Sequence, residues 1–347
     1  MNKEKSYIKI CEDTKKGKNI YPIKGGLRNT CYLYNDSEVK YFVKVYNEDT
    51  QYSKHMSECR CVSEFFVTKY LYDKDCHVAQ PLYYDKEQKI GIYEYIEAKN
   101  IKAYGQLDMD LCFLVMCELS KIHQLPVVNE IGMCKFTDLD RDDLLRYLSN
   151  GIDFLCEIKE VKNAYIDSKL LDNIVNRIEK MNKVIGNTQL HDGNVLISEN
   201  GEVSFCDFEK VCPHYPQMDI MSFINCRKMS IEDEKKIIDY YISINNIRDS
   251  KHFYCVYNLL FIIDCLRILK KIKYNEDGLK VKWVEVNGKK IKKFEKTKSD
   301  EGIRWNRERG ESIEQRLHDI QIKKYSDDPL CNALRDVIKR IEKDSLV

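Results

Sequence analysis

Two short apolar segments joined by Asn200-Gly201 constrain the fold of this chain more than any other feature. The segments cover residues 194–198 and 202–207, and Asn-Gly between apolar runs is a strong signal for a β-hairpin. Patterns of helical periodicity lie on both sides of the pair. Asn194 begins the first segment and Asp207 ends the second, so the hairpin brings two oxygen ligands to one end. Magnesium prefers such ligands and shares them with phosphate groups.

The rest of the pattern changes from strand to helix along the chain. Residues 20–46 are rich in aromatic and β-branched residues and are interrupted by Gly25-Gly26 and Asn35-Asp36, which predicts three antiparallel strands. A helix at 53–71 and two strands at 81–84 and 89–95 follow. Later helices are predicted at 107–125, 140–157, 167–184, 230–245 and 251–271, with two more near the C-terminus.

We therefore predict an α+β, two-lobed fold. A small antiparallel β lobe covers residues 1–97, and a larger, mostly helical lobe covers residues 98–347. The helical lobe contains the catalytic-loop and metal hairpin within 186–210. It also contains a second, basic hairpin near 272–300, where apolar segments flank Asn287-Gly288.

Composition excludes several classes of protein. The chain has 347 residues and 43% apolar residues, as expected for a globular protein. Its formal net charge of +1 is too small for the protein as a whole to attract nucleic acid or a membrane surface. No signal peptide and no run of the ~18–20 apolar residues that span a membrane is expected, and residues 256–269 indicate a buried helix. The 15 cysteines are interpreted as reduced, buried or incidental thiols, since no spacing resembles that of a structural zinc site. A cytoplasmic location follows as an expectation.

Three N-terminal features favour a phosphate-binding site. Gly25 and Gly26 lie between two strands, where backbone N–H groups reach a phosphate readily. Lys44 lies within an apolar strand, and Glu64 in the following helix is the candidate partner for its charge, with Glu58 as the alternative. A plain turn and an edge-strand lysine facing water are the simpler interpretations of the first two features.

These residues and their order resemble the aminoglycoside phosphotransferase and choline kinase group of protein-kinase-like enzymes. The resemblance covers residues 20–225 and implies binding of ATP and Mg²⁺. It implies nucleotide contacts from the turn, the strand lysine, its partner and the backbone of the hinge Tyr93-Glu94-Tyr95-Ile96. The implied cofactor-binding residues are Gly25, Gly26, Asn29, Lys44, Glu64, Glu94 and Ile96.

The catalytic segment also resembles that of the group. Its His-Gly-Asp-Leu-His-x-Gly-Asn pattern matches Leu190, His191, Gly193 and Asn194, and its helix ending Leu-His-x-Leu-Pro resembles residues 122–126. The resemblance implies that Asn194 and Asp207 bind the metal. Asp219 matches an aspartate that braces the catalytic loop.

One departure from that pattern bears on the chemistry. The group's catalytic aspartate is replaced by Gln189, which hydrogen-bonds a hydroxyl group but does not take up its proton at neutral pH. Asp192 is the only nearby carboxylate and is the candidate substitute. Gln189 and Asp192 are therefore the predicted catalytic residues.

Three functions remain open from the sequence. The first is an ATP-dependent phosphotransferase acting on a small hydroxyl compound, and the second is a pseudokinase that binds nucleotide or acts as a scaffold. The third is binding of nucleic acid or another polyanion through residues 270–298, which contain eleven lysines and four acidic residues. A solvated charged hairpin is the simpler interpretation of that segment. The acceptor and the oligomeric state are not predicted.

Overall fold

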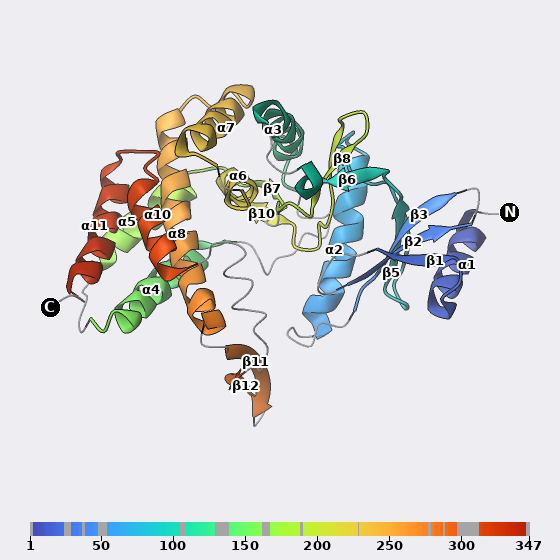
Figure 1. Cartoon of the computed structure of the whole chain (residues 1–347), viewed down its shortest axis with the longest axis horizontal. Coiled ribbons are helices and arrows are strands. Elements are labelled where there is room, and N and C mark those ends of the chain that lie inside the picture. Colours follow the sequence, from blue (N-terminus) through green and yellow to red (C-terminus); the bar gives the residue numbers. More distant parts are fainter. Residues whose placement is uncertain are drawn as a thin grey trace. The chain divides into compact units, whose positions relative to one another are not determined.

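The computed structural model describes residues 3–23, 29–36, 39–47, 54–104, 108–128, 139–161, 167–187, 190–227, 229–276, 279–286, 289–296 and 312–344 (Figure 1). Residue contacts divide the chain into two compact units. Unit 1 contains Met1–Asp138, Lys183–Met229 and Lys236–Asn245, and unit 2 contains Leu139–Asn182, Ser230–Lys235 and Asn246–Val347. The predicted lobe boundary at residues 97 and 98 stays a prediction.

The N-terminal part of unit 1 contains an antiparallel sheet of five strands in the order β1-β2-β3-β5-β4. The strands are β1 (Ile20–Ile23), β2 (Thr30–Asn35), β3 (Lys40–Val45), β4 (Pro81–Asp85) and β5 (Ile90–Glu94). Helix α2 (Lys54–Tyr72) connects β3 to β4. Lys44 is in register with Cys31 of β2 and Gly91 of β5, so it lies on a central strand and the edge-strand interpretation is wrong.

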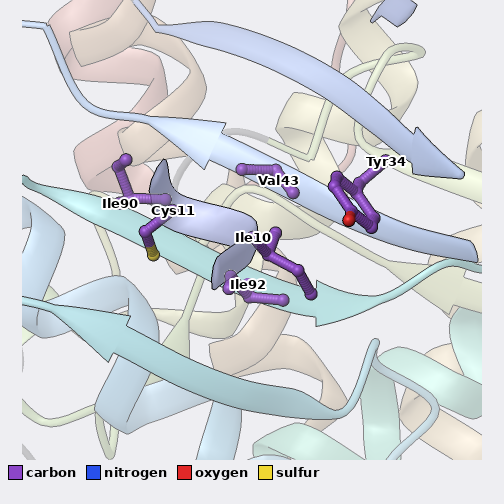
Figure 2. Close-up of a cluster of buried hydrophobic side chains, with 6 residues drawn as sticks. All are labelled: Ile10, Cys11, Tyr34, Val43, Ile90 and Ile92. Atoms are coloured by element: carbon purple, nitrogen blue, oxygen red, sulfur yellow. The ribbon is translucent and has the colours of Figure 1, made fainter. Parts of the chain in front are cut away.

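Helix α1 (Lys3–Lys16) was not predicted from the sequence, and it covers part of this sheet. Its buried residues Ile10 and Cys11 pack with Tyr34, Val43, Ile90 and Ile92 of β2, β3 and β5, as Figure 2 shows. The ends of the helix follow local rules, with Glu4 in its first turn, Lys15 and Lys16 in its last turn and Gly17 beyond it at a positive φ of 68°.

The remaining part of unit 1 positions the predicted catalytic hairpin. Strands β8 (Val195–Ser198) and β9 (Val203–Phe205) form that hairpin, and β6 (Ala98–Asn100) pairs with β8. Gly201 occupies the turn with φ of 83°. Strands β7 (Val184–Gly186) and β10 (Cys212–His214) form a second pair, so the predicted helix at 167–184 is wrong in its last residues. The helices here are η1 (Ile101–Tyr104), α3 (Met109–His123), α6 (Pro216–Asn225) and α7 (Ile231–Ile244), the last divided between the units.

Unit 2 is mostly helical. Its helices are α4 (Arg141–Ile158), α5 (Ser168–Glu179), α8 (Ser250–Glu276), α10 (Ile313–Ile322) and α11 (Pro329–Asp344). Gly151 of α4 allows close approach to α8, because a Cβ there would lie 2.6 Å from Leu266 Cβ. The predicted basic hairpin is present as β11 (Leu279–Val286) and β12 (Lys289–Lys296), and its role in binding a polyanion stays a prediction.

One window of α8, Ser250–Leu269, is long and apolar enough to cross a membrane by length and composition alone, which corrects the expectation that no run approaches that length. Its mean hydropathy is 1.5, yet 78% of the window is buried inside the protein. A central helix of a helical core has the same character, which is the interpretation the sequence favoured.

Candidate functional site

Lys44 is the centre of the candidate site. Its Nζ donates to Glu64 Oε1 at 3.0 Å and Oε2 at 2.8 Å, and to Asp207 Oδ1 at 2.7 Å. The Lys44 and Glu64 side chains are each only 6% exposed. The structure therefore pairs Lys44 with Glu64, while the side chain of the alternative partner, Glu58, lies outside the described residues. Lys44 of β3 thus links the sheet to α2 through Glu64 and to the end of the β8–β9 hairpin through Asp207.

A third carboxylate, which sequence reasoning did not select, joins this cluster. Carboxylate oxygens of Glu64, Asp207 and Glu209 all lie within 4.8 Å of one another. With one lysine among three carboxylates, the fully ionised cluster has an excess of two negative charges. Glu209 follows Asp207 by two residues, and that spacing is the only sequence signal that would have identified it.

The electrostatics of the cluster separate its members. Burial lowers the pKa of Lys44, but the charges of Glu64, Asp207 and Glu209 outweigh it and hold that pKa well above its ordinary value. Burial raises the pKa of Asp207, but the charge and hydrogen bond of Lys44 lower it overall. Lys44 and Asp207 are therefore both ionised near neutral pH.

Glu64 behaves differently. Burial raises its pKa to about 7, the charges of Asp207 and Glu209 add to this effect, and Lys44 opposes it. The Glu64 carboxylate is thus close to its midpoint at neutral pH. Any cation that neutralised Asp207 and Glu209 would remove their repulsion and favour ionised Glu64.

The predicted glycine turn is described only at its end. Gly25 and Gly26 lie outside the described residues. Asn29 follows the turn, and its Nδ2 donates to Glu209 Oε2 at 2.8 Å. The end of the turn is therefore attached to the carboxylate cluster.

The two predicted metal ligands lie at the same end of the β8–β9 hairpin. The Cys206 N–H, next to Asp207, donates to the Asn194 carbonyl oxygen at 3.1 Å, and Asn194 is only 5% exposed. Asp207 has a positive φ of 64°, which is uncommon for a residue other than glycine. This conformation turns the backbone away from the direction of β9, which ends two residues earlier at Phe205.

The braced segment before the catalytic loop follows the expected pattern. Asp219 at the start of α6 is fully buried and accepts a hydrogen bond from the Asn187 N–H at 2.9 Å. His123 Nε2 lies 3.1 Å from the same carboxylate, and His123 Nδ1 lies 2.7 Å from Tyr241 Oη. Although burial raises the pKa of Asp219, the bonds from His123 and Asn187 lower it overall. Gln189, two residues beyond Asn187, lies outside the described residues.

Asp192, the candidate substitute base, is held by an arginine. Asp192 Oδ1 lies 2.7 Å from the Arg227 guanidinium, although the two atoms do not meet the geometry of a hydrogen bond. The guanidinium carbon lies 3.6 Å from the centre of the Phe223 ring, and the side chain is only 9% exposed. Asp192 is therefore paired with a largely buried arginine.

The predicted hinge residues lie at and after the end of β5. Glu94 is the last residue of β5, its N–H donates to the Gln80 carbonyl at 2.9 Å, and Ile96 follows two residues later. A surface cavity of about 610 Å³ is lined on one side by Glu94 and Tyr95. Its other walls come from α1, β3 and β4, and the lining does not include Lys44, Glu64 or Asp207. We therefore do not place the chemistry in that cavity.

Tyr93, the first residue of the predicted hinge, forms a buried pair with Tyr46, and sequence reasoning did not predict this pair. Tyr93 and Tyr46 are each 4% exposed, and their hydroxyl groups lie 2.8 Å apart. Gly91 leaves room for them, since a Cβ there would lie 2.8 Å from the Tyr93 ring. The ring of Tyr46 also lies 5.3 Å from Lys44 Nζ, so this pair forms part of the wall beside the lysine.

A comparison with models of protein families identifies the family of this chain. The sequence model described as the Phosphotransferase enzyme family matches residues 19–243. A curated relative, the transcription antitermination protein NusB of Clostridium perfringens, is 29% identical over 116 residues, which span 31% of this chain and 84% of that protein. That shorter match carries no property over to this chain.

Solved structures show the same fold at low identity. A choline/ethanolamine kinase family protein from Mesorhizobium loti has a TM-score of 0.52 at 10% identity and covers 95% of this chain and 99% of its own. The aminoglycoside phosphotransferase APH(2'')-Ib in its ADP-bound form has a TM-score of 0.52 at 15% identity, with 78% and 91% covered. The predicted α+β, protein-kinase-like fold is confirmed by these similarities.

Proposed function

This chain belongs to the phosphotransferase enzyme family, and from that premise we propose that it transfers phosphate from Mg–ATP to a hydroxyl group of a small molecule. By their names, the structures that share its fold include kinases that act on choline, ethanolamine or aminoglycosides. All of these substrates are small molecules.

One observation carries the proposal: Lys44 Nζ contacts both Glu64 and Asp207. Kinase-like sites need a strand lysine held by a helix glutamate, so that the ammonium group reaches the nucleotide phosphates. Glu64 supplies that support from α2. The bond from Lys44 to Asp207 supports the same function, because bound phosphate would take the place of one carboxylate around the lysine.

The donors around Lys44 fit a magnesium ion. Asp207 and Glu209 supply hard oxygen atoms, Asn194 lies at the same end of the hairpin as Asp207, and the cluster has excess negative charge that a divalent cation would neutralise. We propose that Asp207 and Asn194 hold the ion, with Glu209 as a further ligand or as a partner of its bound water. The ion would neutralise charge that develops on the phosphates during transfer.

The catalytic loop is suited to hold an acceptor but lacks the usual base. Asp219 fixes the Asn187 N–H, and Asp192 is paired with Arg227, so the two residues stabilise the loop on either side of Gln189. We propose that Gln189 orients the acceptor hydroxyl by a hydrogen bond and that its proton leaves to solvent. A general base usually contributes ~10²–10⁴-fold, so transfer is slow compared with an aspartate-containing enzyme.

Binding and turnover test this proposal together. We expect Mg–ATP to raise the melting temperature of the wild-type protein and slow ADP formation to follow in the presence of a mixed panel of small amino alcohols. Asp207→Ala should lose both effects. Asp73→Ala is the matched control, since Asp73 is 53% exposed and its carboxylate pairs with Lys69 of α2. Absence of any Mg–ATP effect on the wild-type protein would refute the proposal.

A second candidate function rests on Gln189 itself. A pseudokinase would bind nucleotide at Lys44 without transferring phosphate, and the ion pair of Asp192 with Arg227 disfavours Asp192 as a substitute base. Single-turnover measurement with a large excess of protein over ATP separates the two functions. ADP formed over hours and abolished by Asp207→Ala supports the enzyme, whereas tight binding without ADP supports the pseudokinase.

A further inference from the structure

A second group of metal-ligand side chains lies in unit 2, far along the chain from the phosphotransferase residues. Cys255 of α8, Cys331 of α11 and Asp328, just before α11, each offer one ligand atom, and these atoms all lie within 4.8 Å of one another. The two cysteines are 76 residues apart in the sequence, and their exposed fractions are 1% and 0%. The group is thus buried and assembled only by folding.

The separation of the two sulfur atoms distinguishes between uses of this pair. Cys255 Sγ and Cys331 Sγ lie 3.9 Å apart. A disulfide requires about 2.05 Å. Two thiolates bound to one zinc ion at about 2.3 Å each, at a tetrahedral angle, lie about 3.8 Å apart. The observed separation therefore fits the edge of a zinc tetrahedron without rearrangement of the helices.

The carboxylate is already oriented by partners of its own. Asp328 Oδ1 accepts from the Leu330 N–H at 2.9 Å, and Asp328 Oδ2 accepts from Arg177 of α5 at 2.6 Å. The same Arg177 nitrogen lies 3.6 Å from Cys255 Sγ. Outer groups that fix a ligating side chain in this way are characteristic of metal sites. Each carboxylate oxygen keeps a further lone pair for a metal.

A candidate fourth ligand, His252, lies one helical turn before Cys255, outside the group whose ligand atoms lie within 4.8 Å of one another. His252 lies three residues earlier on α8, so its side chain projects from the same face of the helix. Its Nε2 is buried and has no hydrogen-bond partner among the described residues. A buried ring nitrogen without a partner is costly unless something binds it.

We propose that Cys255, Cys331, Asp328 and His252 form a zinc site that ties α8 to the start of α11. Zinc favours mixed sulfur, nitrogen and oxygen ligands in a tetrahedron. On binding, the two thiols release their protons to solvent and form two zinc–sulfur bonds. The three negative charges of two thiolates and one carboxylate are then balanced by two charges from zinc and one from Arg177.

Cobalt substitution tests the site in the full-length protein. After removal of metal with a chelator, Co²⁺ is titrated with Mg²⁺ in excess, so that the oxygen ligands of unit 1 do not compete. We expect one equivalent of Co²⁺ to give thiolate charge-transfer absorption in the near ultraviolet and the strong visible bands of tetrahedral cobalt. One equivalent of Zn²⁺ should remove both. Absence of charge-transfer absorption in the wild-type protein would overturn the proposal.

Single variants assign the ligands. Cys255→Ser and Cys331→Ser should each weaken Co²⁺ binding at least about tenfold and reduce the charge-transfer absorption. Cys265→Ser is the matched control, because Cys265 is a buried cysteine of the same helix outside the cluster, and it should leave both quantities unchanged. His252→Gln should weaken binding about tenfold while the charge-transfer absorption remains. Unchanged affinity would remove His252 from the ligand set.

Intact-mass measurement of the wild-type protein keeps the proposal testable if a variant does not fold. Under non-denaturing conditions the protein as purified should carry the mass of one zinc ion. A protein lighter by two hydrogens, with no bound zinc, together with a peptide map that assigns the disulfide to Cys255 and Cys331, would refute the site.

Discussion

Each unit places one basic side chain beside a group of side chains that we propose to bind a metal, but those side chains differ in kind. In unit 1, buried Lys44 contacts two of three clustered carboxylates, and in unit 2, partly exposed Arg177 contacts the Asp328 carboxylate and the Cys255 thiol of a group that also contains Cys331. Hard oxygen ligands suit magnesium, whereas sulfur ligands select zinc. A lysine is a compact charge that phosphate can take over, while the planar guanidinium of arginine holds a carboxylate in place. Lys44 is therefore suited to exchange a carboxylate for a phosphate, whereas Arg177 is suited to hold Asp328 permanently.

The largest effect we expect comes from replacing the glutamine at position 189. Gln189→Asp restores a carboxylate that can accept the acceptor's proton, so the turnover number should rise by ~10²–10⁴-fold. ADP formation under saturating Mg–ATP measures this, and Gln315→Asp on α10 is the control. The Co²⁺ spectrum of unit 2 should not change. An unchanged turnover would show that position 189 does not face the reaction.

Removal of the central lysine should have the next largest effect. Lys44→Met keeps a long apolar side chain but removes the ammonium group, and loss of one such electrostatic contact costs ~10²–10³-fold in turnover. Lys69→Met on α2, where the lysine is 54% exposed, is the matched control. If the lysine variant retained full turnover, the oxygen cluster would have no role in transfer.

A packing change in unit 2 tests whether the stability of that unit can change without a change in ATP affinity. The Cβ of Gly151→Ala would lie 2.6 Å from Leu266 Cβ, so α4 and α8 must move apart, and such overpacking costs about 1–3 kcal/mol of unfolding free energy. We expect a lower melting temperature with unchanged ATP affinity at low temperature. A loss of affinity in the folded variant would contradict that separation.

The smallest effect we expect is a pH dependence from Glu64. Its pKa is raised to about 7, so the carboxylate is protonated below that pH and no longer holds Lys44 as an ion pair. ATP affinity should therefore fall by roughly tenfold per pH unit below 7 and level off above it. Glu64→Gln should remove the dependence. The affinity for zinc should also decrease as the pH is lowered, because the thiolates take up protons. That decrease should persist in Glu64→Gln.

The sequence predicted the site best where its residues lie close together in the chain. The β8–β9 hairpin and its turn follow local rules, and the strand order around Lys44 follows from alternation and turn residues. Glu64 was identified from its place on the next helix. Glu209 was missed, although it lies only two residues after Asp207, because its carboxylate meets the others only through the backbone turn at Asp207.

Features that depend on distant partners were not predictable. Strand β7 exists because residues 184–186 pair with β10, and its apolar pattern by itself continued a helix. The charged sequence of α1 concealed the helical spacing of Tyr7, Ile10, Cys11 and Thr14. Cys255 and Cys331 are 76 residues apart in the sequence. The search for zinc-ligand spacings compared only cysteines that are close in the sequence, so it did not connect this pair. Only the fold brings these two together.

The dependence of ATP affinity on magnesium tests the central claim most directly, because it reports on the oxygen cluster whether or not transfer is fast. Calorimetric titration of ATP with and without Mg²⁺, in the wild-type protein and in Asp207→Asn, measures it. We predict that Mg²⁺ tightens ATP binding at least about tenfold in the wild-type protein and has little effect in the variant. Equal affinity with and without Mg²⁺ in the wild-type protein, or the same gain in Asp207→Asn, would contradict the assignment of this site as a Mg–ATP site.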